Sequence, residues 1–273
     1  MIDCPVYVLH YKRNSDRLAY LRGSALEALR PAFITEMDKD EFAMEDVYRY
    51  DPVEYARRVM LFKDTQIGTV IGLNNRDWSW AECIDHVRRE EWTVEDVMAK
   101  CPWLRPQPLK ASDVSLLLKH RLAWERIASR SGDYAIVAED DVFLFDDSLA
   151  YLETILKNLP SDFDYIDIAG GLNLAPRGDP VVNEYFYRMV PPRARTTCCA
   201  ILRTAFVRKI LREDLSLVLG IDWMLTTLFQ QLRANVYWVE PIVFGHGSQM
   251  NMYASNREAD TPRGFSPLRW QGD

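Results

Sequence analysis

The sequence predicts an α/β fold in which helices cover both faces of a mostly parallel central sheet. Strand and helix patterns alternate along the chain, beginning with the β-branched and aromatic run VYVLHY at residues 6–11. The run YAIVA at residues 134–138 is continuously apolar, as expected of a central parallel strand buried on both faces. The segment SDVSLLLKHRLAWERIASRSGD, residues 112–133, is apolar around most of a helix, which predicts a largely buried helix beside that sheet.

The first strand, residues 6–11, leads through the polar turn KRNSDR into LAYLRGSALEAL, residues 18–29. The leucines and alanines of that segment recur with helical spacing. PAFITEMD, residues 31–38, has the composition of a second strand. Strand, helix and strand in this order predict the opening unit of a parallel sheet.

The second half of the chain continues the alternation after the apolar strand. Helices are expected at residues 147–159, 204–213 and 220–234, and strands at residues 163–171, 196–203 and 235–248. The whole chain, residues 1–273, is expected to form a single domain. Within it, residues 38–110 are an irregular insertion rich in tryptophan, and residues 255–273 are a polar tail.

Composition and charge exclude several classes of protein. The formal net charge of -7 argues against a nucleic-acid partner, which needs a basic face. No apolar run reaches the roughly 18 residues that a membrane-spanning helix needs. The N-terminal segment lacks the parts of a signal peptide, so we expect a cytoplasmic protein. The five cysteines have no C-x-x-C spacing, which indicates neither a disulfide framework nor a zinc knuckle.

Three carboxylates, Glu139, Asp140 and Asp141, come directly after the apolar strand in the sequence YAIVAEDDVFLFDD. Buried charge is costly unless it is paired or bound to a cation. In open α/β sheets, ligands bind beyond the carboxyl ends of the strands, where this triplet is expected to lie. An extended chain would point Glu139 and Asp141 to one side and Asp140 to the other.

Two carboxylates on one side suit Mn²⁺ or Mg²⁺, which bind oxygen ligands together with substrate phosphates. The alternative is a solvated acidic loop, but the triplet has apolar runs on both sides, YAIVA and VFLF. The chain has no G-x-x-x-x-G-K-[ST] loop, no G-x-G-x-x-G after the first strand and no G-x-S-x-G elbow. Their absence disfavours P-loop enzymes, nicotinamide dehydrogenases and α/β hydrolases.

Several segments together resemble glycosyltransferase family 25, the lipooligosaccharide galactosyltransferases and related collagen galactosyltransferases. In order they are VYVLHYKRNSDRLAYL, SLLLKHRLAWERIA, YAIVAEDDVFL, FDYIDIAGG and GIDWML. Asp16 and Arg17 match the end of the family's basic turn, and the Glu-Asp-Asp block is matched in full. Lys119 and His120 match the family's Ser-His pair only in part, and the tryptophan-rich insertion also departs from the pattern.

The resemblance implies a GT-A-like fold and a nucleotide-sugar-dependent hexosyltransferase. The donor would be a UDP-sugar, by default UDP-galactose, and the acceptor a hydroxyl group, by default of a glycan. The acidic triplet would be the family's version of the Asp-x-Asp motif. Asp141 would then ligate Mn²⁺ or Mg²⁺, and Glu139 would bind the ribose or the metal and its water. A divalent cation would stabilise the charge that develops on the diphosphate leaving group.

The resemblance also gives roles to two later residues. His246, between two glycines, would make a further contact with the metal or the diphosphate, and the alternative is an ordinary loop histidine. Asp222 would be the general base that deprotonates the acceptor, and the alternative is a favourable charge at a helix N-terminus.

The remaining candidate residues are expected to bind substrate. They are His10, Tyr11, Arg13, Arg17, His120 and Asp140. The four that follow the first strand would lie near the nucleotide base and ribose, where Arg13 or Arg17 could pair with phosphate. For these arginines the alternative is a solvated turn, and for His120 it is a histidine satisfied within the core. Trp78, Trp80 and Trp92 are candidates for stacking on a sugar.

Two other functions fit the same pattern. A metal-dependent nucleotidyltransferase would usually carry a glycine-rich basic loop after the first strand, and HYKRNSDR contains no glycine. A catalytically inactive glycosyltransferase-like binding module would not need the acidic triplet, which is intact.

Overall fold

The computed structural model describes most of the chain outside its insertion and its tail. The described residues are 4–49, 51, 54, 58, 89, 96, 108–171, 174–176, 178–213, 215, 217–248, 250 and 252. Trp78, Trp80, Trp92 and the tail at residues 255–273 lie outside them. Among the described residues, no helix combines the length and the apolar character needed to cross a membrane.

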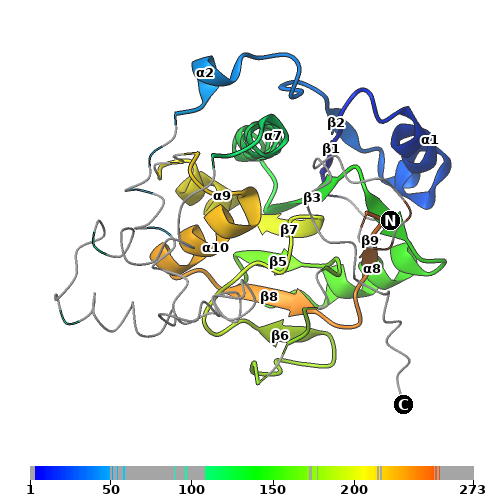
Figure 1. Ribbon diagram of the computed structural model, residues 1–273. Helices are drawn as coiled ribbons and strands as arrows, with labels where there is room; N and C mark the ends of the chain where they lie inside the picture. The colour runs from blue at the N-terminus through cyan, green and yellow to red at the C-terminus, as the bar shows by residue number, and fades with distance from the viewer. Residues whose placement is uncertain are drawn as a thin grey trace.

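Strands and helices both recur along the described chain, although several strands and the last two described helices follow one another directly (Figure 1). The strands are β1 (Val6–Leu9), β2 (Ala32–Ile34), β3 (Tyr134–Glu139), β4 (Val142–Leu144), β5 (Tyr165–Asp167), β6 (Phe186–Arg188), β7 (Cys199–Arg203), β8 (Val236–Val239) and β9 (Phe244–His246). The helices are α1 (Ser15–Gly23), the 3-10 helix η1 (Ala25–Leu29), α2 (Met44–Val47), α7 (Ala111–Ala128), α8 (Ser148–Lys157), α9 (Thr204–Ile210) and α10 (Ile221–Gln231).

In the described part of the chain, the main sheet has seven strands in the order β2-β1-β3-β7-β5-β8-β6. β1 is parallel to β2 and β3, and β5 is parallel to β8. β7 is antiparallel to both of its neighbours, and β6 is antiparallel to β8. Every strand except β7 and β6 therefore runs in one direction, which confirms a mostly parallel, GT-A-like α/β sheet.

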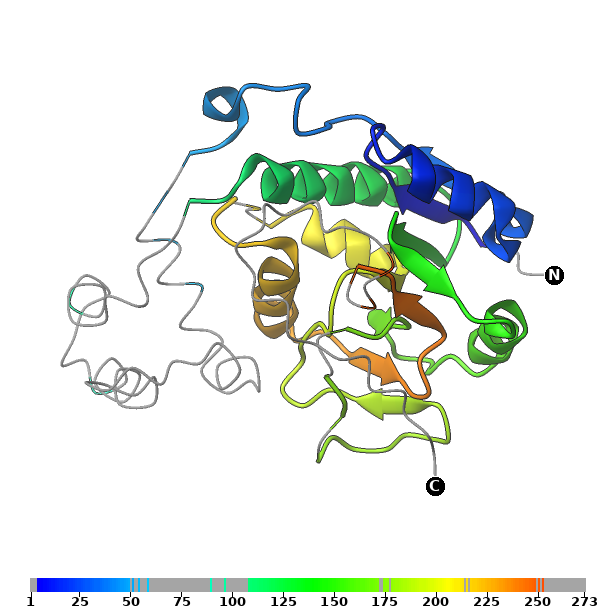
Figure 2. The same ribbon diagram turned by 45° about the vertical axis from the view of Figure 1, so that its right-hand side comes forward.

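Two hydrophobic cores cover the two faces of this sheet. Ala135 and Val137 of β3 pack in one core with α7, α9 and α10. Ile136 and Ala138 alternate with them and pack in the other core with α1, η1 and α8. Figure 2 shows these two groups of helices on opposite sides of the strands. The continuously apolar run of β3 is thus explained, because both faces of this strand are buried.

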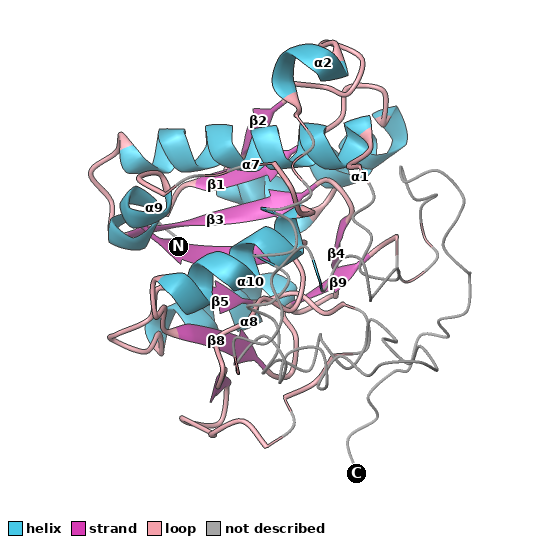
Figure 3. Cartoon of the chain, turned by 60° about the vertical axis from the view of Figure 1, so that its left-hand side comes forward, coloured by secondary structure: helices cyan, strands magenta, loops and turns pink. Residues whose placement is uncertain are grey.

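The predicted strand at residues 235–248 forms two strands. β8 belongs to the main sheet, and β9 pairs instead with β4 in an antiparallel ladder of its own. Residues 240–243 separate them, and Pro241 has no N–H with which to continue a ladder. Figure 3 shows this small ladder beside the end of β3, at the position where the acidic triplet lies.

Candidate functional site

The three carboxylates of the triplet bind three different groups of residues. Asp140 lies in the turn between β3 and β4, and its side chain contacts the segment after β1. Its Oδ1 accepts a hydrogen bond from Arg17 at 2.6 Å. Its Oδ2 lies 3.0 Å from His10 Nδ1 and accepts from Asn14 at 3.0 Å and from the Tyr11 backbone at 3.1 Å. Asp140 therefore holds the loop after β1 against the end of β3.

Charge and hydrogen bonds stabilise the ionised form of Asp140. Burial raises its pKa, but the hydrogen bond from His10 and the charge of Arg17 outweigh burial and lower that pKa below its usual value. Arg17 and His10 are both buried beside it. The structure thus places these two expected nucleotide-binding residues in contact with a carboxylate of the protein itself.

The other expected residues of this loop have different neighbours. Arg13 is exposed and pairs with Asp40. The ammonium nitrogen of Lys39 lies over the Tyr11 ring, 5.2 Å from the ring centroid. Lys119, where the sequence departs from the family pattern, is buried and donates to the backbone carbonyl of His10 at 2.8 Å. This lysine fixes the end of β1 against α7.

Asp141 forms the second group with residues of the β9 segment. Its Oδ2 lies 3.1 Å from His246 Nε2 and accepts from Ser248 Oγ at 2.6 Å. The ladder between β4 and β9 pairs Val142 with His246, which brings the histidine beside the residue that precedes Val142. The buried Cys198 completes a set of metal-ligand atoms, one each from Asp141, Cys198 and His246, that lie within 4.8 Å of one another.

Asp141 and His246 form a hydrogen-bonded pair, and each shifts the pKa of the other. Burial raises the pKa of Asp141, but the charge of His246 and the hydrogen bonds from His246 and Ser248 outweigh burial and lower it to about 2. Burial lowers the pKa of His246, and the nearby Asp141 carboxylate raises it above its usual value. Burial also raises the pKa of the Cys198 thiol.

These side chains have the chemistry of a divalent-cation site. Asp141 Oδ1 and His246 Nδ1 are buried and form no hydrogen bond within the described residues. Carboxylate ligands suit Mn²⁺ and Mg²⁺, whereas imidazole and thiolate ligands add affinity for Zn²⁺. The structure brings together two of the three expected ligands, Asp141 and His246. Glu139 contributes no atom to this set, and Cys198 takes the third place.

Glu139 belongs to the third group, together with Thr197 and Asp222. The Thr197 hydroxyl lies 2.5 Å from Glu139 Oε1 and 2.9 Å from Asp222 Oδ1. His120, on α7, places its Nε2 3.7 Å from the same Glu139 oxygen. Asp222 lies in the first turn of α10, so three separate elements contribute to this group. Two carboxylates that share one hydroxyl can receive a proton from an incoming hydroxyl group.

A buried carboxylate, Asp167, lies at the end of β5. It accepts hydrogen bonds from the Arg195 backbone at 2.7 Å and from the Tyr165 hydroxyl at 3.3 Å. Burial raises the pKa of Asp167 to about 8, and the charge of Asp222 adds to that rise. The Arg195 guanidinium pairs with Glu240 and lies 4.6 Å from the centroid of the Trp238 ring. Burial therefore favours the protonated form of Asp167.

Sequence reasoning missed Thr197, Cys198 and Ser248. The first two lie in TTCCAILR, which has the composition of a buried strand, and a buried cysteine is most often a small apolar residue. Ser248 is adjacent to the GHG motif, and that proximity is the one local signal for it. Thr197 has no local signal, because its partners are 58 and 25 residues away.

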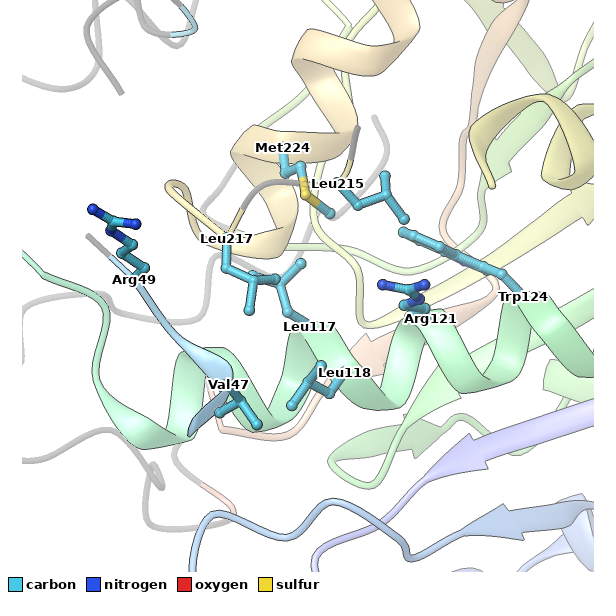
Figure 4. Close-up of a pocket in the computed structure, with 9 residues that line it drawn as sticks. All are labelled: Val47, Arg49, Leu117, Leu118, Arg121, Trp124, Leu215, Leu217 and Met224. Atoms are coloured by element: carbon cyan, nitrogen blue, oxygen red, sulfur yellow. The ribbon is translucent and has the colours of Figure 1, made fainter. Parts of the chain in front are cut away.

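An apolar pocket of about 420 Å³ lies between α7, α10 and the residues before α10 (Figure 4). Its lining residues are Val47, Arg49, Leu117, Leu118, Arg121, Trp124, Leu215, Leu217 and Met224. Met224 follows Asp222 by two residues, so the two side chains leave α10 in nearly opposite directions. The pocket still lies near the Glu139 group, because its lining residue Trp124 packs against His120 with ring centroids 5.9 Å apart, and His120 Nε2 lies 3.7 Å from Glu139 Oε1.

The sequence matches no protein-family model, and no curated protein is significantly similar to it.

Proposed function

We propose that this protein is a metal-dependent glycosyltransferase that moves a sugar from a nucleotide-sugar donor to a hydroxyl acceptor. One observation carries the proposal. At the end of β3, Glu139 and Asp141 are two residues apart, yet one carboxylate contacts Asp222 through Thr197 and the other contacts His246. A group suited to a cation and a group suited to a general base are therefore adjacent.

Asp141 and His246 would hold the divalent cation, with Cys198 beside them. The cation, when bound, would neutralise the charge that develops on the diphosphate leaving group. The protein's own residues fix the Asp141 carboxylate in place without the cation. Ser248 and His246 orient the Asp141 carboxylate, and burial excludes water from it. Asp140 and Arg17 hold the turn that carries Asp141.

Asp222 would act as the general base in a single displacement. The oxygen of the acceptor hydroxyl donates an electron pair to the anomeric carbon of the donor sugar, and its proton passes to the Asp222 carboxylate. The bond between the anomeric carbon and the phosphate oxygen breaks, and its electron pair leaves with the nucleoside diphosphate. A carboxylate suits this task when it lies within hydrogen-bond reach of the hydroxyl that it deprotonates.

The donor and acceptor classes rest on the sequence resemblance to glycosyltransferase family 25. It supports a UDP-sugar, with UDP-galactose as the first donor to test, and a glycan hydroxyl as acceptor. Tyr11, Arg13 and His120 are the residues proposed to line the donor and acceptor positions, whereas His10 is buried against Asp140 and would support the loop that carries Tyr11 and Arg13. Arg17 and Asp140 would act on them through the loop after β1, because they pair with each other.

Calorimetric binding to a panel of nucleotide sugars, with and without Mn²⁺, tests the proposal. We expect one donor to bind in the presence of Mn²⁺. Without an acceptor, that donor should be hydrolysed slowly, with water taking the sugar and the nucleoside diphosphate being released. Asp141→Asn should abolish the metal-dependent part of binding, whereas Asp146→Asn, an exposed carboxylate in the same segment, should not. The proposal fails if no donor binds, or if the protein instead releases pyrophosphate from a nucleoside triphosphate and a sugar phosphate.

A further inference from the structure

We propose that Thr197 is a positioning residue that orients the Asp222 carboxylate toward the acceptor hydroxyl. This inference rests on the proposed function and adds a residue to it. Thr197 is buried, with 4% of its surface exposed, and its side chain lies between the carboxylates of Glu139 and Asp222. A residue that joins two acidic groups at a site of proton transfer controls where each of them points.

The backbone around Thr197 is fixed on the side of the sheet. The Glu139 N–H donates to the Cys198 carbonyl at 2.8 Å, which continues the antiparallel pairing of β3 with β7. This bond places Thr197 next to the Glu139 side chain. Because the pairing of the two strands sets this position, Thr197 meets Glu139 in a defined orientation.

The same segment is also fixed on the side of α10. The Ala194 N–H donates to Thr226 Oγ1 at 3.1 Å, and the Thr226 hydroxyl donates to the Asp222 carbonyl at 2.9 Å. The first turn of α10 is thus bonded to the chain that carries Thr197. A segment held from both sides can keep two carboxylates in fixed positions.

The Thr197 hydroxyl has one proton and two carboxylate neighbours. It can donate to only one of them at a time, and its oxygen lies within donating distance of both Glu139 Oε1 and Asp222 Oδ1. When the hydroxyl donates to Asp222 Oδ1, it holds that oxygen of the carboxylate in place. His120 faces the Glu139 side of the group from α7. We therefore assign Glu139 to hold Thr197, and Thr197 to keep the Asp222 carboxylate oriented.

Two substitutions separate the hydroxyl of Thr197 from its shape. Thr197→Val removes the hydroxyl and keeps the branched shape, while Thr197→Ser keeps the hydroxyl. Thr227→Val is the matched control. Thr227 is a buried threonine of α10, the helix that carries Asp222, and its hydroxyl donates to the Met224 carbonyl at 2.8 Å. The probe is UDP-galactose with Mn²⁺ and water as acceptor, or the donor of the panel that binds most tightly.

We expect Thr197→Val to lower kcat for release of the nucleoside diphosphate at least about tenfold. Donor Kd should stay within about twofold, because the positioning acts on the base and not on donor binding. Thr197→Ser should restore kcat to within about threefold of wild type, and Thr227→Val should match wild type. If Thr197→Val does not fold, as judged by thermal unfolding, Thr197→Ala removes the hydroxyl without adding bulk.

Three results would overturn the inference alone, while the wild type binds donor and turns it over. The first is a wild-type kcat in the variant that lacks the hydroxyl. The second is an equal loss in Thr197→Ser, which would show a steric role. The third is a loss of donor affinity as large as the loss of kcat. A wild type that binds no donor overturns the proposed function, and this inference with it.

Discussion

The guanidinium group of Arg17 and the carboxylate of Asp140 form a buried ion pair, with Nη1 2.6 Å from Oδ1. It joins α1 to the turn after β3. Removing one member of a buried pair leaves an uncompensated charge, which costs about 3–5 kcal/mol. We therefore expect Arg17→Ala to lower the free energy of unfolding by about 3 kcal/mol, measured by urea denaturation.

The matched control for this pair is Arg121→Ala. Arg121 pairs with Glu125 at 3.1 Å on the exposed surface of α7, and such a pair contributes about 0.5 kcal/mol or less. Equal losses of stability in the two variants would contradict the structural role given to Arg17.

Asp167 should make stability depend on pH. Its pKa is about 8 in the folded protein, against an ordinary value of 3.8, so the folded state binds more protons than the unfolded state between these values. The free energy of unfolding should therefore fall as pH rises from about 4 to about 8. Asp167→Asn cannot ionise, so it should remove this part of the slope. Chemical denaturation at several pH values checks it, and an unchanged slope in the variant would refute it.

Cys198 should influence which cation binds. A thiolate ligand favours Zn²⁺ over Mn²⁺. We expect Cys198→Ala to lower Zn²⁺ affinity at least about tenfold and to change Mn²⁺ affinity little. Cys199→Ala is the control, because Cys199 is equally buried but lies outside the ligand set. Competition with a chromophoric chelator measures both metals, and a similar effect of the two variants on Zn²⁺ would exclude Cys198 as a ligand.

Gly171 should be intolerant of a side chain. A Cβ there would lie 2.1 Å from Thr196 Cγ2, next to Thr197. At Gly170 the nearest atom, at 2.7 Å, is Cδ1 at the end of the flexible Ile242 side chain. We expect Gly171→Ala to cost roughly 1–3 kcal/mol in the free energy of unfolding and Gly170→Ala less. Urea denaturation compares them, and the reverse order would show that the Thr196 segment yields more easily than its contacts indicate.

Local patterns predict most of the fold of the described residues. The continuous apolar run of β3 predicts a strand buried on both faces, and its residues do alternate between two cores. The reversed direction of β7 has no local signal, because the composition of TTCCAILR indicates a strand but not the direction in which it runs. Direction depends on which strand it pairs with. The division of residues 235–248 into β8 and β9 likewise depends on pairing with β4.

The candidate site divides in the same way. The sequence determines that three carboxylates follow a buried strand, and therefore that the protein must supply them with protons, cations or ion-pair partners. Tertiary structure alone decided their partners: Arg17 for Asp140, His246 for Asp141 and Thr197 for Glu139. Each of these partners lies tens of residues or more from its carboxylate along the chain. Local composition cannot encode such contacts, because strand register and the packing of α10 bring the side chains within hydrogen-bond distance.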